Sequence, residues 1–128
     1  MSTPATIDWR SVVREAGPYP PDAYDFLRTG LAHTVEMIHG DDVPATDAAR
    51  HVSGHQLSLG LRDYAIQQFG LLAGPVLRRW NVRGTEDFGR MVFNLVDAGL
   101  MRTSDEDQLE DFVDVYDFEE AFPLPAAV

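Results

Sequence analysis

The sequence contains no cysteine and no lysine, and it has no long apolar run. Without cysteine, disulfide bonds, thiolate catalysis and cysteine-ligated zinc are excluded. No apolar stretch approaches the roughly 18 residues that a membrane-spanning helix requires. The first nine residues lack the basic start and the apolar stretch of a signal peptide. We therefore expect a cytoplasmic protein that does not enter a membrane.

Sequence motifs for catalysis and cofactor binding are also missing. The chain has no GxSxG nucleophile motif, no phosphate-binding P-loop and no GxGxxG dinucleotide motif. No histidine pair is accompanied by the glutamate of an HExxH zinc site. We therefore predict no cofactor, and a non-catalytic role is favoured over an enzyme.

The chain is long enough for one domain. Its 128 residues, of which 45% are hydrophobic, can build one modest core. Residues 1–18 are expected to form an N-terminal segment with a short helix. Residues 19–118 are expected to form a single globular domain, followed by an acidic and aromatic C-terminal tail at 119–128.

Apolar residues spaced three and four apart predict helices in the first hundred residues. These helices cover residues 21–38, 53–69, 72–80 and 85–98. The first is predicted to bury Tyr24, Leu27, Leu31, Val35 and Ile38. Ser53 and Gln56 have the spacing of a capping box, and Thr85 is expected to cap the last helix.

The negative charge is concentrated near the C-terminus. The formal net charge is −11, yet nine acidic residues and no basic residue lie between Ser104 and Glu120. The rest of the chain carries a net charge of only about −2. We call residues 104–122 the acidic segment.

The apolar period changes from helical to alternating within the acidic segment. Residues 111–118, "DFVDVYDF", alternate with a period of two and are rich in valine and aromatic residues, which predicts a β-strand. That strand would pair with residues 100–103. The fold class predicted is therefore mainly α, a winged-helix-like domain with a C-terminal β-hairpin. The alternative has Ser104 capping a helix that continues through Val113.

Four aromatic residues distinguish the acidic segment from a disordered acidic tail, which would be poor in aromatics. Burying one such ring stabilises a domain by roughly 1.5–3 kcal/mol. We expect Phe112 and Tyr116 to complete the core, and Phe118 and Phe122 to remain free for a partner.

An acidic segment that carries aromatic residues suits a groove with a basic rim and an apolar interior. We therefore predict a non-catalytic protein-interaction module that binds a protein with a basic surface. Homo-oligomerisation through the same segment stays open. The predicted partner-binding residues are Asp114, Tyr116, Asp117, Phe118, Glu119, Glu120 and Phe122.

A nucleic-acid-associated regulator is the first alternative. Its phosphate-binding residues would be Arg78, Arg79, Arg83 and Arg90, which could equally pair with the acidic segment. An acidic wing would repel a duplex, so specific DNA binding is not expected.

A metal protein or enzyme is the second alternative. His51 and His55 are four residues apart, a spacing that places two ligands on one helical face. Because His51 precedes the expected cap at Ser53, no metal site is predicted. Asp63 lies in the middle of a predicted helix, where a salt bridge is its expected use.

Several segments together resemble a known family. They are "YPPDAYDFL", "RHVSGHQL", "LRDYAIQQFG", "VLRRWNVRGTEDFGRMVFNLVDAGLM" and "DFVDVYDFEEAF", within residues 19–122. This pattern is similar to a family of short conserved hypothetical proteins found mainly in Planctomycetes and Verrucomicrobia. The resemblance implies a bacterial protein with a related fold, and it implies no activity, cofactor or catalytic residue. The residues shared with that pattern are His51, Ser53, Asp87, Phe88, Gly89 and residues 114–122.

Overall fold

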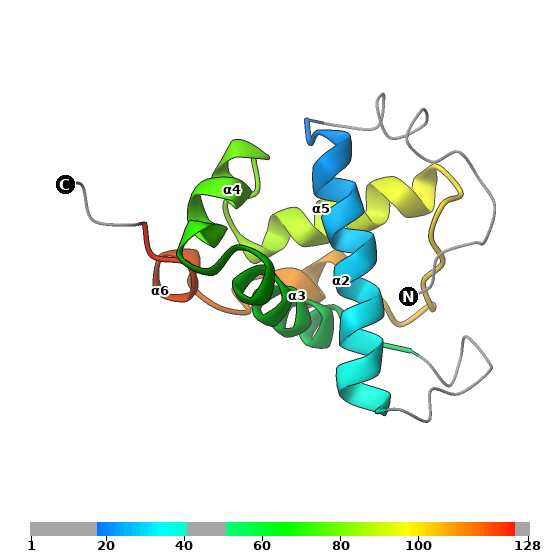
Figure 1. The fold of residues 1–128 in the computed structure, drawn as a ribbon. Helices are drawn as coiled ribbons and strands as arrows, with labels where there is room; N and C mark the ends of the chain where they lie inside the picture. The colour runs from blue at the N-terminus through cyan, green and yellow to red at the C-terminus, as the bar shows by residue number, and fades with distance from the viewer. Residues whose placement is uncertain (1–17, 41–50, 125–128) are drawn as a thin grey trace.

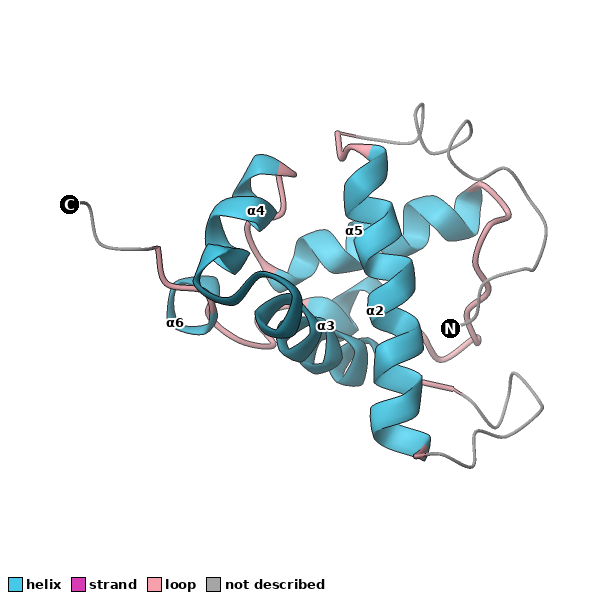
Figure 2. Cartoon of the chain, in the orientation of Figure 1, coloured by secondary structure: helices cyan, strands magenta, loops and turns pink. Residues whose placement is uncertain are grey.

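The computed structural model describes residues 18–40 and 51–124 of the chain (Figure 1). The predicted short helix in residues 1–18 therefore lies outside the described residues, apart from Pro18. Within the described ranges there are helices and no β-strand (Figure 2). The elements are α2 (Pro21–His39), α3 (Gly54–Phe69), the 3-10 helix η1 (Gly70–Leu72), α4 (Ala73–Arg79), α5 (Thr85–Asp97), the 3-10 helix η2 (Leu109–Phe112) and α6 (Phe118–Ala121).

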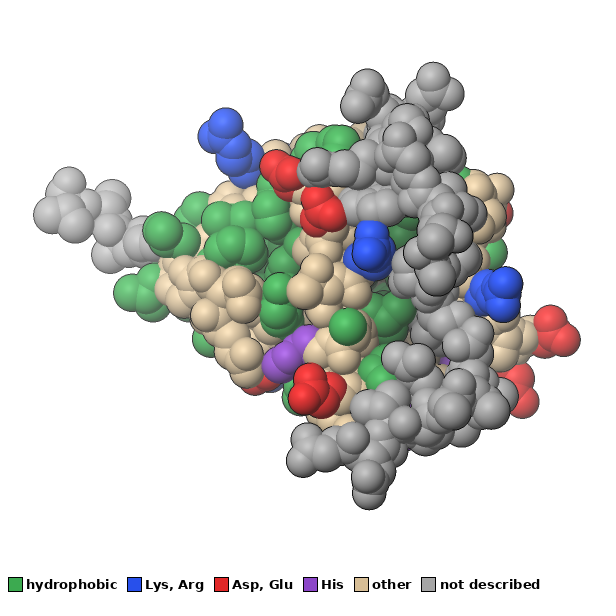
Figure 3. All heavy atoms as spheres, turned by 45° about the vertical axis from the view of Figure 1, so that its right-hand side comes forward, with side chains coloured by type: hydrophobic (Ala, Val, Ile, Leu, Met, Phe, Trp, Pro, Cys, Tyr) green, Lys and Arg blue, Asp and Glu red, His purple; other side chains and the backbone are tan. Residues whose placement is uncertain are grey.

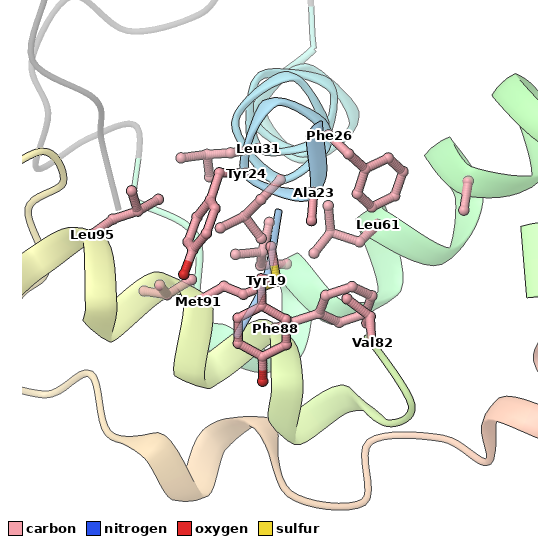
Figure 4. Close-up of a cluster of buried hydrophobic side chains, with 14 of the residues drawn as sticks. Tyr19, Ala23, Tyr24, Phe26, Leu31, Leu61, Val82, Phe88, Met91 and Leu95 are labelled. Atoms are coloured by element: carbon pink, nitrogen blue, oxygen red, sulfur yellow. The ribbon is translucent and has the colours of Figure 1, made fainter. Parts of the chain in front are cut away.

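Helices α2, α3 and α5 enclose the core (Figure 4). On α2 the predicted face is buried at Tyr24, Leu27, Leu31 and Val35. The prediction was wrong for Ile38, which is 39% exposed, because the last turn of α2 projects beyond the packed helices (Figure 1). Helix α5 contributes Phe88, Met91, Val92 and Leu95, all buried.

Two glycines let α2 and α3 approach each other closely. A Cβ on Gly60 would overlap the side chain of Thr34, and a Cβ on Gly30 would overlap Leu61. The hydroxyl of Thr34 is buried and donates to the carbonyl of Gly30 at 2.7 Å, so its polar atom is satisfied within α2. The contact is thus built from small residues on both helices.

The capping box at the start of α3 is confirmed. The Gln56 amide donates to Ser53 Oγ at 3.1 Å, and the Ser53 amide donates to Gln56 Oε1 at 2.9 Å. These two bonds satisfy amide groups that the first helical turn leaves without partners. They fix where α3 begins, immediately after the part of the chain that carries His51.

The predicted cap of α5 was wrong. Thr85 is the first helical residue, and the capping acceptor is Asp87, whose carboxylate accepts from the amides of Arg83 (2.8 Å) and Gly84 (3.2 Å). The side chain of Thr85 is buried and turns instead toward the acidic segment. A sequence pattern shows that a threonine can cap a helix, but not which neighbour competes for its hydroxyl.

The predicted β-hairpin was also wrong. Residues 100–103 do not form a strand with 111–118; the chain forms η2, a turn and then α6. Two backbone groups of residues 111–118 are bonded instead to one side chain. Thr85 Oγ1 donates to the carbonyl of Phe112 at 2.5 Å and accepts from the Val115 amide at 3.2 Å. Without a hairpin, the winged-helix-like description has no wing.

The alternative helix from Ser104 through Val113 does not form either. The Ser104 amide donates to Asp107 Oδ2 at 2.8 Å, as the expected cap spacing requires. The chain then makes a turn and leaves helical geometry before η2 begins at Leu109. The capping pattern is therefore used to close a single turn.

Candidate functional site

The acidic segment is held on the helical domain by Phe112, which is completely buried. Its ring lies between α3 and α5, at two residues that have no side chain. A Cβ built on either Gly54 or Gly89 would lie 2.8 Å from carbon atoms of this ring. Burial of Phe112 was predicted and is confirmed. Gly54 and Gly89 as its receptor were not predicted, because a glycine inside a helix carries no local sign of what packs on it.

Tyr116 forms the second attachment. Its hydroxyl donates to the carbonyl of Ser58 on α3 at 2.8 Å, and its ring is half-buried. Burial raises the pKa of Tyr116, although the nearby guanidinium of Arg62 partly opposes this effect. The guanidinium carbon of Arg62 lies 5.9 Å from the ring centroid, within the range of a cation–π contact.

Phe118 and Phe122 are not free for a partner, contrary to the prediction. Phe122 is only 3% exposed, and its ring centroid lies 5.0 Å from that of Phe118. Phe118 is half-buried and packs against Phe88 of α5 at 5.7 Å between centroids. It also stacks on Tyr116, at 5.9 Å and an interplanar angle of 8°. The aromatic residues thus form one cluster that attaches the acidic segment to the domain.

The carboxylates of the acidic segment divide into two groups. Asp107, Asp111 and Asp117 accept from nearby amides and stabilise its own turns, at 2.8, 2.9 and 2.8 Å. The others are exposed to solvent: Asp105, Glu106, Glu110, Asp114, Glu119 and Glu120. Asp117 is exposed as well, so all four predicted partner-binding acids, Asp114, Asp117, Glu119 and Glu120, are exposed, whereas the aromatic ones face the domain.

An apolar pocket lies beside α6, and the sequence reasoning missed it. Its volume is about 280 Å³. The pocket is lined by Ile66, Gly70, Leu71, Gly74, Ala121, Phe122 and Pro123. The left-hand side of the view in Figure 3 also carries exposed apolar side chains. Two adjacent leucines directly after the end of α3 were the signal in the sequence that could have indicated it.

A polar hollow of about 420 Å³ brings together His51 and His55. His51 Nε2 lies 3.4 Å from Asp107 Oδ1, and the Asp107 side chain is only 3% exposed. The acidic residues that line the hollow are Glu106, Asp107, Glu110 and Asp111. Within residues 18–40 and 51–124, no group of three or more of these residue types has an arrangement that could hold a metal ion.

Asp63 lies elsewhere, and its carboxylate meets a histidine side chain, with which it forms a salt bridge only when the histidine is protonated. Its Oδ2 lies 2.7 Å from Nε2 of His33, linking α3 to α2, and it also accepts from Gln67 at 2.9 Å. His51, His55 and Asp63 therefore do not meet in one site.

The predicted phosphate-binding arginines also have different surroundings. Arg90 is paired with Asp87 at 2.9 Å, and Tyr19 donates its hydroxyl to the same carboxylate. Hydrogen bonds with Tyr19 and Asp87 raise the pKa of Arg90. Arg79 and Arg83 are exposed, and Arg78 is half-buried. At least one of the four arginines is thus engaged within the domain.

Comparisons with models of known families, with curated proteins and with solved structures found no match to this chain. The family resemblance therefore stays a prediction. None of the helices in the described part of the chain is long and apolar enough to cross a membrane.

Proposed function

We propose that this chain is a non-catalytic protein-interaction module that binds a partner protein with a basic surface. The observation that supports this proposal is the attachment of the acidic segment to the domain. Phe112 and Phe122 are buried, while Asp114, Glu119 and Glu120 remain exposed. The buried rings hold the backbone of the acidic segment in place. Its exposed carboxylates, which have no basic neighbour in the sequence, therefore point into solvent from a fixed position.

An ordered acidic surface binds differently from a disordered acidic tail. A tail must lose conformational freedom when it binds, and this cost reduces its affinity. Residues already held by buried rings avoid most of that loss. Exposed carboxylates also attract a basic partner over a distance, so they mainly increase the association rate and make it dependent on salt.

Neutralising two carboxylates of α6 tests this proposal. Removal of residues 104–128 would also take Phe112 and Phe122 out of the core and so destabilise the domain, which makes Glu119→Gln/Glu120→Gln the sharper variant. The matched control, Glu36→Gln/Asp97→Asn, removes the same charge from exposed acids of α2 and α5. Each full-length chain serves as bait in an extract of its host, and captured proteins are identified, purified and titrated back.

We expect a basic protein whose affinity falls with rising salt. The α6 variant should weaken its binding by about tenfold at low salt, since each exposed pair contributes up to about 1 kcal/mol. The control variant should bind like the wild type. A partner that both variants bind equally well, or that binds independently of salt, would contradict the proposal.

A further inference from the structure

The apolar pocket beside α6 has a composition that a water-exposed surface rarely shows. Leu71 and Ile66 line the pocket and are 80% and 44% exposed, and Leu72, next to Leu71 in the chain, is 59% exposed. Single exposed leucines are ordinary, but apolar residues gathered around one hollow are characteristic of an interaction site. We propose that this pocket receives one large aliphatic or aromatic side chain of the partner, flanked there by basic residues.

The local backbone explains why these leucines point outward. Helix α3 ends at Phe69, and the next residue, Gly70, has a φ of 53°, a conformation that residues with a Cβ rarely adopt. The chain therefore leaves the axis of α3 before Leu71 and Leu72, and none of the three residues of η1 is buried. A continued α3 would have carried these positions along its own surface instead.

The opposite wall of the pocket is fixed by contact between α4 and the end of the acidic segment. A Cβ on Gly74 would lie 2.6 Å from the carbonyl oxygen of Phe122, so only glycine allows this approach. Phe122 itself is held by its ring contacts with Phe118 and Tyr116. This wall of the pocket is thus held by contacts within the chain, so a binding side chain need not open it.

The size and the charge of the surroundings indicate the occupant. The volume of about 280 Å³ is far more than a single water molecule needs, so the pocket has room for a side chain. Ala121 lines the pocket, and the two residues before it in α6, Glu119 and Glu120, are exposed. A partner side chain that enters is therefore apolar, and its sequence neighbours meet carboxylates, which favours arginine or lysine there.

This inference rests on the proposed function, because it assigns a second contact to the same basic partner. It adds a requirement that charge alone does not impose: the partner must carry an apolar anchor between its basic residues. The pocket provides specificity, since an anchorless basic segment would leave apolar surface in water.

Peptides of the form Arg-Arg-X-Arg-Arg, with X as Gly, Leu or Phe, distinguish the apolar contact in the pocket from the charge contact with the carboxylates of α6. Affinities are measured by titration against full-length wild type, Leu71→Gln, Glu119→Gln/Glu120→Gln and Met37→Gln. Met37 is 54% exposed in the last turn of α2 and does not line the pocket, so it controls for loss of an exposed apolar side chain. Because Leu71 is so exposed, Leu71→Gln should fold normally, and circular dichroism checks this.

For the wild type we expect the Leu and Phe peptides to bind about tenfold more tightly than the Gly peptide, a difference of about 1.4 kcal/mol. Leu71→Gln should reduce this preference to twofold or less, and Met37→Gln should preserve it. The α6 variant should weaken all three peptides while keeping their ratio. Methyl NMR shifts on binding should map to Ile66, Leu71 and Ala121.

Three results would overturn the inference. Equal wild-type affinity for the Gly and Leu peptides, combined with weaker binding by the α6 variant, would show that the pocket does not bind the partner. The proposed function would still hold. If the α6 variant binds every peptide as tightly as the wild type does, the result would instead contradict the proposed function. Concentration-dependent self-association abolished by Leu71→Gln would show that a second copy of this chain fills the pocket.

Discussion

The helices from residue 21 to residue 97 and the acidic segment are held together in opposite ways. Each helix satisfies its own backbone hydrogen bonds and needs the rest of the domain only to cover one apolar face. The acidic segment has short helical turns, and its aromatic residues attach it to α3 and α5. Its backbone at Phe112 and Val115 is bonded to the side chain of Thr85, about 30 residues earlier.

This difference shows what a highly charged sequence requires in order to stay folded. The exposed carboxylates of the acidic segment repel one another, and no base within it offsets them. Buried rings supply the opposing free energy, each worth roughly 1.5–3 kcal/mol. Changes at the attachment points should therefore release the acidic segment, whereas changes at its exposed residues should alter binding and leave the fold intact.

Truncation of the main attachment has the largest expected effect. Phe112→Ala leaves a cavity between α3 and α5, and it should lower the free energy of unfolding by about 3–5 kcal/mol. The neighbouring Val113 is 48% exposed, so Val113→Ala should change it by no more than about 0.5 kcal/mol. Urea denaturation measures both, and similar values for the two variants would show that Phe112 is not an anchor.

Filling the space that receives the ring should have a smaller effect. Alanine usually stabilises a helix over glycine by about 1 kcal/mol, yet Gly89→Ala should be destabilising by about 1–3 kcal/mol because the new methyl group meets the Phe112 ring at 2.8 Å. In a Phe112→Ala background the same change should become neutral or stabilising. Additive effects in this double-mutant cycle would contradict the proposed ring position.

The smallest expected effect is a dependence of stability on alkaline pH. A tyrosine ordinarily has a pKa of about 10, and burial raises the pKa of both Tyr116 and Tyr19 in the folded chain. Above pH 10 the unfolded chain loses these protons while the folded chain keeps them, so the free energy of unfolding should fall as pH rises. Below pH 10 both tyrosines are protonated in the folded and the unfolded chain, so they do not make the free energy of unfolding depend on pH.

Tyr116→Phe should make this fall less steep, because one of the groups that link stability to pH is gone. At neutral pH the variant should lose about 1 kcal/mol with the hydrogen bond to Ser58. Urea denaturation between pH 8 and pH 11 separates the two contributions. An unchanged slope in the variant would mean that Tyr116 is not buried in the folded chain.

The sequence was sufficient for the helices because their stabilising pattern is local. The spacing of Leu57 and Leu61 predicts the buried face of α3, and the capping pattern of Ser53 and Gln56 predicts where the helix starts. It was insufficient for the acidic segment, where alternation of Phe112, Tyr116 and Phe118 resembles a strand. These rings pack instead on residues of α3 and α5, and contacts so distant in the sequence leave no local pattern.

The apolar pocket and the burial of Phe122 could not be predicted either, because both depend on residues distant in the sequence or on backbone angles. Whether Phe122 is free depends on Gly74, which lies nearly 50 positions earlier in the chain. Exposure of Leu71 depends on the φ angle at Gly70, which the sequence permits but does not impose. The charge of the acidic segment could therefore be predicted from the sequence. The pocket that its last residues complete could not.

Amide hydrogen exchange of the acidic segment tests the account most directly. The Val115 amide is bonded to Thr85, and the Phe122 amide is bonded to the Phe118 carbonyl at 2.7 Å. If the rings hold the acidic segment on the domain, both amides should exchange at least a hundredfold more slowly than in an unstructured peptide. Exchange at the unstructured rate, with α5 still protected, would show a detached acidic tail and contradict the central claim.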